Sequence, residues 1–243
     1  MPAFNNFNNR LPDPTFTVND AGVVDSAGTR GPGFASVSVR SVRPAQVSRT
    51  NSGRGVHRET GSHNWEISIK YNPMLRNDFD TVQGFLDSRN GRLKPFYVVL
   101  PQHSKPKDPV FATFVTNNPF STVGTHQAGS PTIMITAANT VVGKLKPGDY
   151  LNIDDPTDAN HQKAYKVAAV ENNSTYNELV PRPSTSQLRV HLMPPLTKTV
   201  LPGAKIRFIN PTFRVIQKSD TLEYELNTDN LYSYQLDLEE IQP

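Results

Sequence analysis

Strict alternation of apolar and polar residues opens the ordered part of this chain. Residues 36–43 place Val37 and Val39 between polar neighbours. Residues 64–71 place Trp65, Ile67, Ile69 and Tyr71 on one face. This period of two predicts two half-buried β-strands. The polar, basic stretch at residues 50–61 separates them, so we expect one long β-hairpin with a charged tip.

A different period follows. Leu75, Phe79, Val82 and Leu86 are spaced by four, three and four residues, which predicts a helix over residues 73–90 with a single apolar stripe. Pro73 suits the first helical position, with Asn72 as the cap, and Asn90-Gly91 predicts a left-handed stop.

Short strand candidates fill the rest of the chain. Between residues 102 and 210 they recur at short intervals, as in a small barrel or sandwich, at residues 131–135, 150–153, 164–170, 188–192 and 205–209. Clean alternation returns at residues 212–216, 224–226 and 231–241. We therefore expect the closing strands to rejoin the first sheet, with the middle of the chain as an insertion.

The predicted fold class is mainly β: a β-sandwich with one flanking α-helix, plus an inserted small β-barrel or sandwich domain. The predicted division is an extended N-terminal arm at residues 1–33, a sandwich from residues 34–101 and 211–243, and an inserted β-domain at residues 102–210. The arm is rich in Asn, Pro and Gly without periodicity, so we expect it to be ordered only where a neighbour holds it.

Composition excludes several classes. The chain has 243 residues, no cysteine and a net charge of +3, so it has neither disulfides nor cysteine-bound metals. No segment is long and apolar enough for a signal peptide or a membrane span. We therefore expect a soluble protein that is made in a cytoplasm and does not insert into membranes.

Charge is distributed unevenly along the sequence. Residues 30–107 hold 13 Lys and Arg against 5 Asp and Glu, whereas residues 220–243 hold 7 acids and no Lys or Arg. One interpretation is a set of solvated surface charges. The other is that the hairpin arginines contact acids of a neighbouring subunit, for which Arg49, Arg54, Arg58, Glu239 and Glu240 are the candidates. Nucleic-acid binding by the hairpin is less favoured because it lacks stacking aromatics before Trp65.

No pattern predicts catalysis, a cofactor or a metal. The six histidines form no ligand spacing, and no serine stands in a nucleophile motif. The oxygen-rich run at residues 154–161 lacks the glycine and distal glutamate of a calcium loop, so a polar turn is the favoured interpretation. Glu239 and Glu240 would point to opposite faces of a strand, which makes them a poor acid/base pair.

A short apolar run bounded by prolines, at residues 95–101, predicts a buried strand after the helix. The combination of hairpin, Trp65 strand, helix and this proline-bounded strand resembles bacteriophage distal-tail or baseplate-hub proteins, which are related to the tail tube. The similarity spans most of residues 36–240 and rests on residues 61–74, 79, 85–86, 89–92, 96–101, 145–150 and 194–196. The N-terminal arm departs from it.

This resemblance implies a structural virion protein of a phage tail, without enzymatic activity, that is assembled in the host bacterial cytoplasm. It implies a ring, a hexamer, that extends the DNA channel and docks the tail tube protein and other baseplate or hub components. DNA would be a partner only by passing through. The alternative is a carbohydrate-binding or host-recognition β-module in which Trp65, Tyr97 and Tyr232 stack on sugars. A β-sandwich hydrolase is a third option, for which paired carboxylates are missing.

Overall fold

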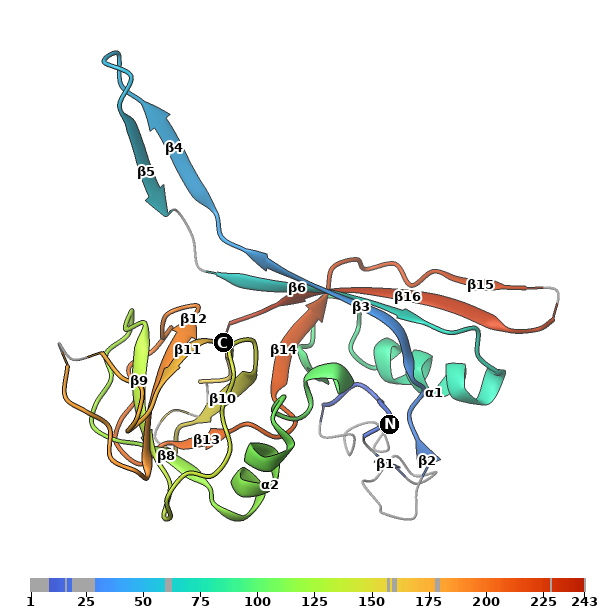
Figure 1. Ribbon diagram of the computed structural model, residues 1–243. Helices are drawn as coiled ribbons and strands as arrows, with labels where there is room; N and C mark the ends of the chain where they lie inside the picture. Colours follow the sequence, from blue (N-terminus) through green and yellow to red (C-terminus); the bar gives the residue numbers. More distant parts are fainter. Residues whose placement is uncertain are drawn as a thin grey trace. The chain divides into compact units, whose positions relative to one another are not determined.

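The computed structural model describes residues 9–15, 17–18, 29–59, 63–156, 158, 161–177, 180–227 and 229–242. The chain divides into two compact units. Unit 1 comprises Met1–Tyr97 and Val215–Ile241, and unit 2 comprises Val98–Arg214 with Gln242–Pro243. The predicted mainly-β fold with a small barrel is confirmed (Figure 1).

One sheet organises unit 1. Its strands run in the order β3-β6-β16-β14-β7, with β15 beside β16. Their bounds are β3 Phe34–Val42, β6 Asn64–Tyr71, β7 Phe96–Val99, β14 Thr212–Gln217, β15 Tyr224–Leu226 and β16 Tyr232–Glu240. The antiparallel pairing of β16 with β6 confirms that the closing strands rejoin the first sheet.

Helix α1 (Arg76–Asp87) covers one face of this sheet. The alternating residues of β6 are buried on that face, as predicted. Phe79 stacks on Tyr232 with ring centroids 4.4 Å apart, and Phe85 meets Phe96 edge-on at 5.4 Å. The helix therefore supplies the apolar side chains that close the core over the sheet.

The start of the helix was predicted wrongly. Met74 exchanges two backbone hydrogen bonds with Tyr232, at 3.0 and 2.9 Å, and so has to be extended. The helix begins only at Arg76, with Leu75 as an N-cap that is 64% exposed instead of part of the buried stripe. The predicted left-handed conformation is confirmed, because Asn90 and Gly91 have φ values of 55° and 61°, but the helix already ends at Asp87 and not at residue 90.

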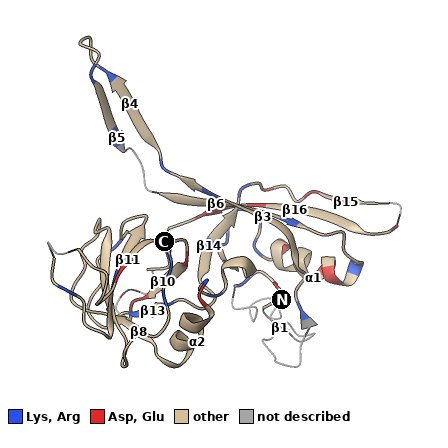
Figure 2. Ribbon diagram, in the orientation of Figure 1, with Lys and Arg blue, Asp and Glu red and all other residues tan. Residues whose placement is uncertain are grey.

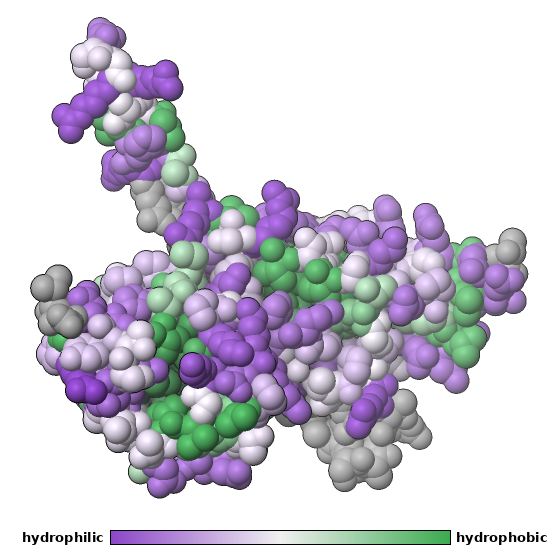
Figure 3. Space-filling view, viewed as in Figure 1, coloured by the Kyte–Doolittle hydropathy of each residue, from purple (hydrophilic) through white to green (hydrophobic). Residues whose placement is uncertain are grey.

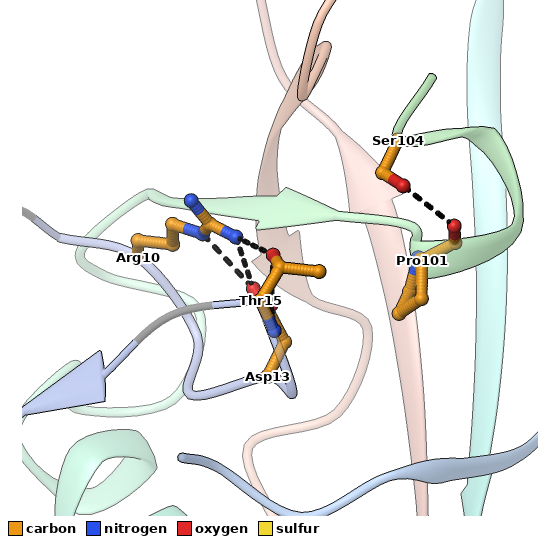
Figure 4. Close-up of polar contacts among 5 residues, drawn as sticks. All are labelled: Arg10, Asp13, Thr15, Pro101 and Ser104. Carbon is orange, nitrogen blue, oxygen red and sulfur yellow. Dashed lines mark hydrogen bonds and ion pairs between the residues drawn. The ribbon is translucent and has the colours of Figure 1, made fainter. Parts of the chain in front are cut away.

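Part of the predicted arm is held by the chain itself. The Leu11 amide donates to the Tyr97 carbonyl at 2.8 Å, the Tyr97 amide donates to the Asn9 carbonyl at 2.6 Å, and Leu11 is fully buried. Arg10 forms an ion pair with the buried Asp13 at 2.6 Å, and Thr15 donates to the same carboxylate (Figure 4). The expectation that residues 1–33 need a neighbour is thus wrong for this segment. Residues 1–8, 16 and 19–28 of the predicted arm lie outside the described residues.

Two short strands, β1 (Thr17–Val18) and β2 (Thr29–Arg30), pair antiparallel after this segment. Among the described residues, no helix is both long and apolar enough to cross a membrane.

Unit 2 is a closed barrel in the strand order β10-β11-β12-β9-β8-β13. The bounds are β8 Phe120–Thr122, β9 Thr132–Thr136, β10 Tyr150–Asp154, β11 Ala164–Glu171, β12 Gln187–Met193 and β13 Lys205–Arg207. All five strands expected between residues 131 and 209 are present. The prediction missed β8, whose three residues are too few to show a period.

The prediction also missed α2 (Pro109–Asn117). Its signal was in the sequence, because Asp108 is an N-cap followed by proline at the first helical position. The Asp108 carboxylate accepts hydrogen bonds from the amides of Val110 and Lys144, both at 2.9 Å. Phe111 and Phe114 of α2 pack with Phe120 into the barrel core. A short 3-10 helix, η2 (Pro101–His103), precedes α2, and the Ser104 hydroxyl donates to the Pro101 carbonyl (Figure 4).

Candidate subunit-contact site

The predicted hairpin extends beyond the sheet of unit 1 as a two-stranded ribbon (Figure 1). It consists of β4 (Ala45–Arg49) and β5 (Gly55–Glu59), which pair antiparallel from Ala45 opposite Glu59 to Arg49 opposite Gly55. Every side chain of β4 is exposed, as are residues 55–58 of β5. An isolated two-stranded ribbon is only marginally stable in water. Because its described side chains are exposed, this ribbon is stabilised mainly by the hydrogen bonds between its two strands.

A tight turn closes the ribbon. The Gly53 amide donates to the Thr50 carbonyl at 2.8 Å, and the Thr50 amide donates to the Arg54 carbonyl at 3.0 Å. Gly53 has a φ of 82° with no atom within 4 Å of an added Cβ, so it serves the turn conformation and not close packing.

The ribbon carries exposed positive charge. Arg49, Arg54 and Arg58 are all exposed, and none of them forms an ion pair with a described residue. Figure 2 marks Lys and Arg positions in blue along this ribbon, and Figure 3 shows a largely hydrophilic surface there. The structure therefore leaves the predicted hairpin arginines available to a partner.

The apolar residues of the ribbon are also exposed. Val47 is 61% and Val56 50% exposed, on opposite faces of the ribbon. Each face of the ribbon therefore presents an exposed valine beside an arginine, Val47 with Arg49 and Val56 with Arg58.

The neighbouring strand β3 ends the sheet. It pairs with β6 along one side, and no described strand pairs with its other side. Val37 and Val39 alternate along it with polar residues, and they are only half-buried, as is Val42. A nine-residue edge strand of this kind exposes a row of backbone donors and acceptors that can pair with another chain.

The acids proposed as partners of the arginines behave differently from one another. Glu240 is only 3% exposed, and its Oε2 accepts a hydrogen bond from the Trp65 amide at 3.1 Å. Its carboxylate is thus engaged inside unit 1, which speaks against the predicted contact with a second subunit. Glu239 is half-buried on the other face of β16, in register with Glu66.

That other face of the sheet has its own charge balance. The Lys218 ammonium lies 2.8 Å from a Glu66 oxygen, and Arg40 lies 3.6 Å from the second oxygen. The hydrogen bond from Lys218 lowers the pKa of Glu66. Because these charges already compensate each other, they are weak candidates for a partner's charges.

A larger acidic surface lies along β16, and the sequence reasoning missed it. On one edge, β16 pairs with β14 at Leu238 and with β15 at Tyr234. Between these points, residues 235–237 of β16 stand opposite the longer stretch 218–223, which has to bulge out. The result is an open groove of about 800 Å³ beside β16.

The charged residues in the walls of this groove, here called the β16 groove, are mainly acidic. Glu223, Glu225 and Asp237 line it and are exposed, with Lys70 as the single basic residue among the lining side chains. None of the three acids forms an ion pair with a described residue. The available signal in the sequence was the base-free acidic run after Lys218, but only pairing shows that it borders a groove.

The bulge is fastened to the end of α1. The Asp220 carboxylate accepts a hydrogen bond from the Arg92 amide at 3.2 Å. A Cβ on Gly91 would lie 2.9 Å from that carboxylate, and Gly91 has a φ of 61°. Glycine at this position therefore allows the bulge to approach the helix terminus.

Within the described ranges, no group of three or more His, Asp or Glu side chains is placed to hold a metal ion. In the oxygen-rich run, Asp154 pairs with Arg207 and Asp158 pairs with Lys198. Residues 157, 159 and 160 of that run lie outside the described part.

Histidines are placed individually instead of in clusters. The His63 ring bonds the Ser41 hydroxyl at 2.9 Å, and the His161 ring bonds the Tyr165 hydroxyl at 2.8 Å. Burial lowers the pKa of His161.

In comparisons with known proteins, no protein-family model matches the chain, and no curated protein matches it either. The surfaces that remain for function are the basic β4–β5 ribbon, the β3 edge and the β16 groove.

Proposed function

We propose that this chain is a structural subunit of a phage tail, which forms a ring at the tail tube or baseplate hub. The ring would extend the DNA channel and dock other baseplate components. The observation that carries the proposal is the β4–β5 ribbon, whose described side chains are all exposed. A ribbon without a core of its own is explained by a neighbour that it contacts.

The β3 edge supports the same proposal. A long edge strand with half-buried valines is an aggregation hazard in a monomer, because it can pair with any exposed strand. In a ring of identical subunits, the same edge has a defined partner and the hazard is removed. Unit 2 would then be free to carry contacts to other tail components.

The carbohydrate-binding alternative receives less support. A stacking platform needs exposed aromatic faces, whereas Trp65 is 3% exposed and lies edge-on against His63. Tyr232 is stacked on Phe79 inside unit 1. Two of the three aromatics expected to bind sugars are thus used for packing.

The test is the mass and shape of the purified native chain. Light scattering at rising protein concentration should show a discrete multiple of the 27.0 kDa subunit. Electron microscopy of that species should show rings with a central opening. A strict monomer at all accessible concentrations, together with the absence of rings, would overturn the proposal.

A further inference from the structure

The basic ribbon and the β16 groove have complementary properties. The ribbon offers Arg49, Arg54 and Arg58 without ion-pair partners among the described residues. The groove offers Glu223, Glu225 and Asp237, which are also exposed and form no ion pair with a described residue. Opposite charges on two exposed surfaces of one sequence steer copies of the chain together and fix their register.

The apolar groups are complementary as well. Val47 and Val56 are exposed on the ribbon, while Tyr224 is 48% exposed in the groove beside the half-buried Leu222. Apolar residues at the centre of a contact and charges around them are the usual arrangement of a protein interface. A volume of about 800 Å³ is enough to receive the side chains at the end of a ribbon.

From this complementarity we infer that the β4–β5 ribbon of one subunit docks in the β16 groove of a second copy of the chain. The inference rests on the proposed ring and names the contact that would build it. It replaces Glu240, which is buried, by the exposed acids of the groove as the partners of the arginines.

Such a contact joins two different surfaces, so each subunit gives a ribbon and receives one. A contact of this head-to-tail type closes into a ring when the rotation between subunits divides a full turn. It also explains why the ribbon needs no packing within its own subunit.

Two charge-reversal variants test the contact. The ribbon variant carries Arg49→Glu, Arg54→Glu and Arg58→Glu, and the groove variant carries Glu223→Lys, Glu225→Lys and Asp237→Lys. Each variant alone sets like charges against each other at every contact. We expect the dissociation constant of the assembly to rise about tenfold or more for each, measured by light scattering and mass photometry.

Mixing the two variants is the decisive arm. In a 1:1 mixture, the native ribbon of one variant meets the native groove of the other, and the reversed ribbon meets the reversed groove. Assembly should therefore return. Because a misfolded variant would not be rescued by mixing, this arm separates lost contacts from lost structure. A mixture that stays dissociated overturns the inference.

A control of equal charge change uses exposed cations elsewhere, namely Lys94→Glu, Lys105→Glu and Lys205→Glu. This variant should assemble like the native chain. If the control dissociates as the ribbon variant does, net charge and not docking is responsible, and the inference is wrong.

The outcomes distinguish this inference from the proposed function. A native chain that never assembles overturns both. A native ring that persists unchanged in the ribbon and groove variants overturns only the docking of the ribbon, and leaves the ring itself supported.

Discussion

The packing of the N-terminal segment predicts opposite effects for two glycines only two residues apart. An added Cβ on Gly31 would lie 2.4 Å from the Asp13 amide nitrogen and 2.5 Å from the Pro12 carbonyl carbon. An added Cβ on Gly33 would meet only the Pro14 ring, at 4.0 Å. Neither glycine has a φ in the left-handed region, so neither substitution strains the backbone. Gly31→Ala and Gly33→Ala therefore differ only in the room around the added Cβ.

The magnitudes follow from these distances. Ordinary contact begins near 3.4 Å, so Gly31→Ala forces the segment at residues 11–13 to move by about 1 Å. Overpacking of this kind costs about 1–3 kcal/mol. If the segment detaches instead, the loss of Leu11 burial, about 1.5–3 kcal/mol, replaces the clash. Gly33→Ala should be neutral or stabilise by about 0.4–1 kcal/mol, because alanine restricts the unfolded chain.

Urea unfolding followed by tryptophan fluorescence measures this difference in unit 1. Trp65 is the only tryptophan of the chain and is buried in that unit, so its emission reports unit 1 and not the barrel. Hydrogen exchange at the Leu11 and Tyr97 amides shows whether the segment shifts or detaches. The two variants unfolding within about 0.5 kcal/mol of each other would refute the packing of residues 9–15 on unit 1.

Three further predictions concern unit 2. Gly143→Ala should destabilise the barrel by about 2–5 kcal/mol, since Gly143 has a φ of 83° and an added Cβ would lie 2.4 Å from the backbone of α2. Gly124 has a φ of 77° with no atom near an added Cβ, so Gly124→Ala should cost only about 1–2 kcal/mol by calorimetry. Equal losses of stability in the two variants would contradict the close approach of Gly143 to α2. Asn152→Ala should cost about 2–4 kcal/mol because it removes three hydrogen bonds to backbone groups, whereas the exposed Asn139→Ala should change little in the same thermal scans. Burial lowers the pKa of His161 below its ordinary 6.5, so the unfolded chain binds the proton more readily. The stability that this difference contributes is present above about pH 6.5 and is lost as the pH falls. The melting temperature of the native chain should therefore fall more between about pH 7.5 and 5.5 than that of His161→Gln. An identical pH dependence in both proteins would count against the buried ring.

Local patterns in the sequence predicted most of the strands, and they separated a sheet of alternating strands from an inserted region of short strands. Alternation in residues 36–43 and 64–71 is a direct consequence of a sheet with one buried face, so the β3–β6 hairpin could be predicted. The apolar stripe of α1 could be predicted for the same reason. Its first residue could not, because the extended conformation of Met74 depends on a bridge to Tyr232, which lies far away in the chain.

The candidate contact surfaces needed the tertiary structure. The sequence by itself determined a basic ribbon and an acidic end, since both are properties of consecutive residues. It could not decide which acids are exposed: Glu240 is buried against the Trp65 amide, whereas Glu223 and Glu225 stand at an open groove. That groove exists because β16 pairs with β14 and β15 at points separated by three residues on one side and six on the other. A mismatch of this kind is set by long-range strand register, which local sequence does not encode.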